Sequence, residues 1–220
     1  MTTKLAGQPA AKAPNDAWKK NGIRPGFRHE LASALAIVEA LYRVKSDHPS
    51  FAWPDGLDKA HFGNVPNSTT SSDLADDPLM KELVALSADE LDLLVYLVAA
   101  HHGKVRMSLR SSPDDDKVDV PDRCPDDKRQ ARGVRDDDAL PSCQIPAADL
   151  KTMNETPAVT LSLDLMELGL SSRYGASWRE RMQLLLERLG PFQLGYLEAL
   201  LRAADCRASK EEDERGKGSN

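Results

Sequence analysis

The 220-residue sequence contains few aromatic side chains and few cysteines. Aromatic residues make up 5% of the chain and hydrophobic residues 40%, so leucine, alanine and valine must supply most of a buried core. The three cysteines, Cys124, Cys143 and Cys206, form no CxxC pair and are odd in number. This usage is typical of a reduced intracellular protein and argues against a disulfide scaffold.

Long apolar runs and an excess of positive charge are also missing. No window is long and apolar enough to span a membrane, and residues 1–20 have no apolar centre like that of a signal peptide. We therefore expect a cytoplasmic protein with no membrane partner. The formal net charge of −6 excludes nucleic-acid binding by bulk electrostatic attraction, so any such contact needs a local groove or pocket.

Helical spacing dominates the pattern that is present. Apolar residues recur at helical intervals over residues 28–44, and Ser87 and Glu90 form a capping box before a second apolar run that stops at Gly103. Two further helices are predicted over 177–190 and 191–209, the first with a Ser177/Glu180 capping box and the second with Pro191 at its first position. Strand alternation is almost absent, which predicts an all-α domain.

We expect the remaining segments to be less regular. Residues 1–26 have the composition of a lead-in or linker, and residues 27–209 form the predicted helical domain. Within it, residues 111–150 combine dense acid with proline and are expected to be an irregular, solvated insertion. Residues 210–220 form a charged tail that is expected to fray.

Histidines at helix ends are the most informative chemical feature. His29 lies at the start of the first helix, and His101 and His102 lie at the end of the second. Imidazoles in the last turn of a helix suit its dipole and cap its carbonyls, so these two need no ligand to be favourable there. We expect His48 and His61, which lie in proline- and glycine-rich loops, to be surface residues.

A metal site is the alternative interpretation of the same residues. Imidazole and carboxylate groups that converge from several helices bind Mn, Ni, Co, Fe or Zn, and Asp205 offers a carboxylate in an otherwise apolar stretch. Consecutive helical residues diverge by about 100°. His101 and His102 can therefore bind one ion only if the last turn loosens, or they bind two neighbouring ions.

The chain resembles a known nuclease family in four segments between Gly26 and Ser209. The segments "GFRHELAS", "LVAAHHGKVR", "LSLDLMELG" and "SWRERMQLLLERLGPFQLGYLEALLRAADCRAS" are similar to the HD-type nuclease domain of the CRISPR-associated helicase–nuclease of type I interference systems. The similarity is to the variant in which this domain follows the helicase. The resemblance implies an HD-phosphohydrolase-like helical fold, one or two divalent transition metals, and degradation of single-stranded DNA in antiviral defence. Implied partners are the helicase portion and an RNA-guided surveillance complex.

The motifs of the family are only partly present. By match to the motifs, His29, His101 and His102 would bind one metal, and Asp205 would help to bind the other. The family also needs an early histidine and a His–Asp dipeptide, and this chain contains no His–Asp dipeptide. We therefore expect a domain that is incomplete at its N-terminus, either a C-terminal fragment or one half of a split enzyme. Whether the chain alone is an enzyme stays open.

Two alternatives and one further assignment follow from the same residues. The chain could be another HD-superfamily phosphohydrolase that acts on nucleotides, or a non-catalytic helical remnant that serves as an interaction module. Lys104 and Arg106 are candidates for phosphate contacts beside the site, as are Arg28 and Arg202. The alternative for all four is that they are surface cations that balance the many acidic residues.

Overall fold

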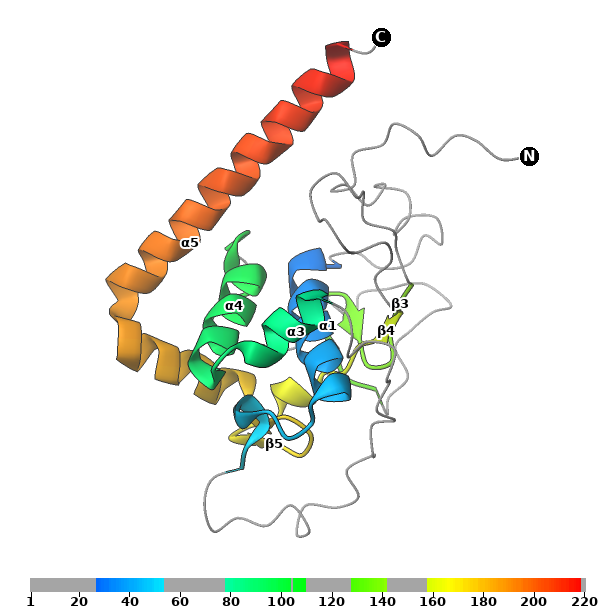
Figure 1. Cartoon of the computed structure of the whole chain (residues 1–220), viewed down its shortest axis with the longest axis vertical. Coiled ribbons are helices and arrows are strands. Elements are labelled where there is room, and N and C mark those ends of the chain that lie inside the picture. Colours follow the sequence, from blue (N-terminus) through cyan, green and yellow to red (C-terminus); the bar gives the residue numbers. More distant parts are fainter. Residues whose placement is uncertain (1–26, 54–77, 104, 110–127, 142–157, 219–220) are drawn as a thin grey trace, which may run out of the picture.

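The computed structural model describes residues 27–53, 78–103, 105–109, 128–141 and 158–218 (Figure 1). These residues are mostly helical, with three two-stranded antiparallel sheets. The helical class predicted from the sequence is confirmed at this coarse level, and the small sheets are the exception to it. The predicted lead-in over 1–26, together with His61, Lys104, Cys124 and Cys143, lies outside the described residues.

All helices and strands of the described chain are short, except for α5. The helices are α1 (His29–Val44), α3 (Pro78–Ala85), α4 (Ala88–Ala100) and α5 (Trp178–Gly218), with 3₁₀ turns η1 (Pro49–Phe51) and η3 (Asp164–Met166). Strands β1 (Gln130–Ala131) and β2 (Val134–Arg135) pair with each other, β3 (Ala139–Leu140) pairs with β4 (Val159–Thr160), and β5 (Leu170–Ser171) pairs with β6 (Gly175–Ala176).

Helices α1 and α4 pack against each other and run in opposite directions, so the start of α1 lies beside the end of α4 (Figure 1). Each helix turns its apolar stripe towards the other, as the 3.6-residue period predicts. Burying these stripes provides most of the stability of the pair, since short helices are marginal alone. The stripes consist of Leu31, Ala34, Leu35, Val38 and Leu41 in α1, and of Leu91, Val95 and Ala99 in α4.

Local sequence signals define both ends of α4. The predicted capping box is present, because the Ser87 hydroxyl accepts the Glu90 N–H at 3.3 Å and the Glu90 carboxylate accepts the Ser87 N–H at 2.8 Å. The helix ends at Ala100, His101 is its C-cap, and Gly103 has a φ of +68°. Only glycine adopts that backbone conformation without strain. The paired histidines therefore lie in the tight turn that follows the helix.

Helix α5 departs from the prediction at its end. Gly190 has a φ of +74° and marks the predicted break before Pro191, and Figure 1 shows α5 bending before its C-terminal part extends away from the other helices. The prediction that the charged tail frays after Ser209 is wrong, since the helix continues to Gly218. The tail contains many good helix formers and no proline, so its composition allows helix despite its charge.

Residues 128–141 are the described part of the solvated insertion predicted over 111–150, and they correct that prediction for this part; residues 111–127 and 142–150 lie outside the described residues. They include the β1–β2 hairpin, in which Ala131 and Val134 are both fully buried. Arg132 and Gly133 form its two-residue turn with φ values of +52° and +74°, which suits a tight hairpin. The Arg132 carbonyl accepts the Arg28 N–H at 3.0 Å, so the hairpin fixes the chain where α1 begins.

His48 is likewise not a surface residue, since it is only 1% exposed. Its Nδ1 accepts the Ser50 N–H at 3.2 Å, which leaves Nε2 to donate to the Leu86 carbonyl at 2.8 Å. The ring therefore links η1 to the segment between α3 and α4. Among the described residues, no helix has both the length and the apolar composition that crossing a membrane requires.

Candidate metal centre

Three histidines from two helices meet at the end of the molecule where α1 begins and α4 ends. His29 is the first residue of α1, and His101 and His102 follow the last residue of α4. One ring nitrogen of each residue lies within 4.8 Å of one ring nitrogen of each of the other two. The loosened turn before Gly103 lets consecutive residues point towards the same place, which a regular helix would not allow.

The closest pair of nitrogens has the spacing of two ligands of one ion. His29 Nε2 lies 3.2 Å from His102 Nε2, and the ring centroids are 4.9 Å apart. Two nitrogens that bind the same tetrahedral ion, each at 2.0–2.1 Å from it, are about 3.3 Å apart. Without an ion, one of the two nitrogens must carry the hydrogen that joins them. The observed spacing fits both states, so little movement would be needed to bind a metal.

His101 is oriented by the helix that it caps. Its Nδ1 lies 2.6 Å from the Val98 carbonyl, which can only accept, so Nδ1 carries the hydrogen and Nε2 keeps its lone pair. The His101 ring lies 4.1 Å from the His102 ring and 5.8 Å from the His29 ring, measured between centroids. A ligating histidine commonly donates its other nitrogen to a carbonyl or carboxylate in this way.

The surroundings of His102 favour the neutral ring that a metal needs. Burial lowers the pKa of His102 below its ordinary value of 6.5, and the charges of His101 and His29 act in the same direction. Glu30 and Asp205 oppose the shift, but their effect is smaller than that of the causes that lower the pKa. His102 is therefore uncharged at neutral pH, with a lone pair available on one nitrogen.

Asp205 approaches this group but is not part of it. It lies in the C-terminal part of α5, is half-buried, and acts on His102 through its charge. Its carboxylate is not among the ligand atoms that lie within 4.8 Å of one another. Of the four residues predicted to bind metal, the structure thus gathers the three histidines and leaves the aspartate at longer range.

Arg106 is engaged elsewhere in the structure. Its guanidinium contacts the buried Glu198 carboxylate at 2.5 and 3.0 Å, and Glu198 also accepts the Tyr96 hydroxyl at 3.1 Å. The hydrogen bond to Glu198 raises the pKa of Arg106. The Arg106 carbonyl accepts the Trp178 indole N–H at 2.7 Å. These contacts give Arg106 a role in joining α4 to α5, and its contact with phosphate stays a prediction.

Glu30 is the residue at this end of the molecule that the sequence analysis missed. It is 1% exposed, and its Oε2 lies 3.5 Å from His29 Nδ1. A glutamate in the first turn of a helix normally indicates a favourable interaction with the helix dipole at the surface. Its burial could have been expected from its position in the helix, because Glu30 lies one and two turns before Ala34 and Val38 on the same buried face.

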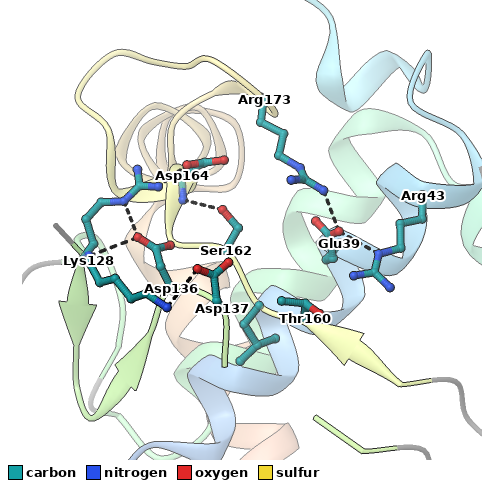
Figure 2. Close-up of a pocket in the computed structure, with 11 residues that line it drawn as sticks. Glu39, Arg43, Lys128, Asp136, Asp137, Thr160, Ser162, Asp164 and Arg173 are labelled. Atoms are coloured by element: carbon teal, nitrogen blue, oxygen red, sulfur yellow. Dashed lines mark hydrogen bonds and ion pairs between the residues drawn. The ribbon is translucent and has the colours of Figure 1, made fainter. Parts of the chain in front are cut away.

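A second group of charged residues lies away from the histidines. An open hollow of about 480 Å³ separates Glu39 and Arg173 from Asp136 and Asp164 (Figure 2). Glu39 accepts from Arg173 at 2.6 Å, and it also accepts from Arg43 and from the Tyr174 hydroxyl. On the opposite side, Arg129 is bonded to Asp136, Asp164 and Glu167. The charges of this hollow pair with one another, which indicates a role in structure.

No protein-family model, curated protein or solved structure matches the chain.

Proposed function

We propose that this chain is the metal-binding part of an HD-type nuclease that degrades single-stranded DNA in RNA-guided antiviral defence. Two arguments support the proposal: the sequence resembles that family over residues 26–209, and the chain folds into helices that bring three of the four matched residues together. The observation that carries it is the 3.2 Å between the Nε2 atoms of His29 and His102, which are 73 positions apart in the sequence.

The proposed cofactor is one divalent transition metal, Mn, Ni, Co, Fe or Zn, bound by His29, His101 and His102. Neutral imidazole suits all five ions. Each ring has a nitrogen that faces the shared position, and the lowered pKa of His102 keeps that ring in the form that binds. Asp205 is the candidate for a further ligand, because its charge already reaches His102.

The reaction we propose is hydrolysis of a phosphodiester. A bound ion polarises a phosphoryl oxygen and makes water a usable nucleophile near neutral pH. The histidines of this chain hold and orient the ion, and Lys104 and Arg106 are the proposed contacts to the DNA backbone. These 220 residues contain no His–Asp dipeptide, so a carboxylate that bridges two ions would come from outside this sequence. The helicase portion and the RNA-guided surveillance complex are the proposed sources of the single-stranded substrate.

A cleavage assay tests this function. Circular single-stranded DNA is incubated with the chain and each of the five metals. His102→Ala is compared with Asp47→Asn, which changes an exposed carboxylate beyond the end of α1 opposite to His29. We expect slow, metal-dependent cleavage that His102→Ala abolishes and Asp47→Asn does not change. Release of phosphate from free nucleotides without DNA cleavage would favour another phosphohydrolase, and metal binding without hydrolysis would favour a non-catalytic module.

A further inference from the structure

Glu30 is a buried acidic residue without a cationic lysine or arginine partner among the described residues. Its side chain is 1% exposed, and its Oε1 is buried without a hydrogen-bond donor. Leaving a buried carboxylate oxygen unpaired lowers the stability of a folded protein. An exposed glutamate in the first turn would interact with the helix dipole without that loss, so the dipole alone does not account for the position of Glu30.

The Glu30 carboxylate and the shared metal position lie on opposite sides of the His29 ring. On one side, Glu30 Oε2 is 3.5 Å from His29 Nδ1, and on the other side, His29 Nε2 is 3.2 Å from His102 Nε2. The first distance is slightly longer than a hydrogen bond, and a small rotation of the ring or of the carboxylate would close it. The order of the groups, carboxylate, imidazole and then the proposed metal position, is that of a carboxylate–histidine–metal triad.

We propose that Glu30 is a positioning residue that holds the hydrogen of His29 on Nδ1 and thereby keeps the Nε2 lone pair directed at the metal position. The inference rests on the proposed metal site. A neutral imidazole carries one hydrogen, and an acceptor beside Nδ1 decides which nitrogen keeps it. The Val98 carbonyl acts on His101 in the same manner, at 2.6 Å from Nδ1. Two of the three rings thus have their tautomers set by an acceptor behind them.

Direct ligation by Glu30 fits the structure less well. The ligand atoms that lie within 4.8 Å of one another come from the three histidines and not from Glu30. Within the group, Glu30 lies beside the nitrogen of His29 that faces away from His102.

Two variants test the proposal on the full chain. Glu30→Met removes the acceptor and fills a similar volume, whereas Glu30→Gln keeps an acceptor oxygen and removes the charge. Nitrogen NMR of the metal-free protein reports which ring nitrogen of His29 carries the hydrogen, and titration with Zn²⁺ or Ni²⁺ reports affinity. In the wild type, we expect the hydrogen of the His29 ring to be on Nδ1. Glu30→Met should lose that preference and bind metal about 10- to 100-fold more weakly, and Glu30→Gln should fall between the two.

The outcomes separate this inference from the proposed function. An unchanged His29 tautomer in Glu30→Met would overturn the positioning role, even if affinity fell, because that pattern belongs to a direct ligand. A tautomer that changes in a protein whose wild type binds no metal would support the role of Glu30 and contradict the metal site. A melting temperature that falls in Glu30→Met with no change of tautomer would show that the glutamate is only structural.

Discussion

Glu30 and Glu39 lie on the same helix and are both almost fully buried, at 1% and 2% exposure, yet their surroundings differ. Glu39 accepts hydrogen bonds from Arg43, Arg173 and Tyr174, so each of its oxygens has a partner. Glu30 has one oxygen without any partner and another near His29. Both oxygens of the Glu39 carboxylate therefore have donors, whereas one oxygen of the Glu30 carboxylate does not.

The difference shows how to separate structural from functional charges in this protein. A buried group that has all its partners contributes to a single well-ordered fold, and its removal leaves other charges unpaired. A buried group that lacks partners lowers stability, and an ion that binds nearby is one of the explanations for such a group. The four predictions that follow test this distinction at paired and unpaired groups, from the largest expected effect on stability to the smallest.

Arg181→Met should have the largest effect. This guanidinium is 4% exposed and is bonded to Asp92 at 2.6 Å and to the carbonyls of Ser50, Tyr174 and Ala176. Its removal leaves a buried carboxylate and three carbonyls without a donor. We expect the free energy of unfolding to fall by about 3–5 kcal/mol, measured by urea denaturation.

The control for this variant is the same change at Arg179, which is exposed on the same helix. Arg179→Met should change the free energy of unfolding by less than about 0.5 kcal/mol. Similar losses in the two variants would mean that the buried network does not determine stability.

Replacing Glu39 and Glu30 with methionine should change the free energy of unfolding by different amounts. Glu39→Met leaves Arg173 and Tyr174 without their acceptor and should lower the free energy of unfolding by about 2–3 kcal/mol, the size of a hydrogen bond to a charged group. Glu30→Met removes a carboxylate with an unpaired oxygen and should not lower it. Chemical denaturation of both variants provides the comparison. The reverse order of stabilities would contradict the distinction between the two regions.

The raised pKa of Tyr96 should make the free energy of unfolding fall at alkaline pH. Burial and the Glu198 carboxylate raise the pKa of Tyr96 from 10.0 to about 12. The folded state therefore keeps the proton that the unfolded state loses above pH 10, so this contribution is present below pH 10 and is lost as pH rises to 12. Tyr96→Phe should flatten the fall in unfolding free energy over that range by about 2 kcal/mol. Parallel curves for wild type and variant would contradict this assignment.

The two adjacent histidines should differ in the metal-free protein. His101→Ala removes the bond from Nδ1 to the Val98 carbonyl and should lower the free energy of unfolding by about 1 kcal/mol. His102→Ala removes the contacts with the His29 and His101 rings but no hydrogen bond to the backbone, and it should change the free energy of unfolding by less than about 0.5 kcal/mol. Thermal denaturation without metal measures both. A loss of several kcal/mol in His102→Ala would show that this ring stabilises the fold and is not kept for a ligand.

Local features of the fold were predictable from the sequence, because their causes are local. The capping box at Ser87 and Glu90, the break at Gly190 and the glycine after the histidines all depend on residues within a few positions of one another. The continuation of α5 beyond Ser209 was missed because charge was interpreted as disorder. The β1–β2 hairpin was missed because two-residue strands are too short to show alternation.

Long-range pairing of charges could not be predicted. Arg181 meets Asp92 across 89 positions, and Glu39 meets Tyr174 across 135. A single sequence gives charged residues the default of an exposed surface. The same limit applies to the candidate site. The three histidines were selected by their places at helix ends and by resemblance to a family, and their meeting depends on the packing of α1 against α4. Glu30 could have been suspected from its position on the apolar stripe.

Calorimetric titration of the metal-free protein with Co²⁺ tests the central claim most directly. The account predicts one ion per chain for the wild type and for Asp47→Asn, and a loss of at least tenfold in affinity for each of His29→Ala, His101→Ala and His102→Ala. Bound metal should also stabilise the fold, by about 2.7 kcal/mol at 100 times the dissociation constant. Absence of binding, or binding that all three histidine variants retain, would contradict a metal centre at this end of the molecule.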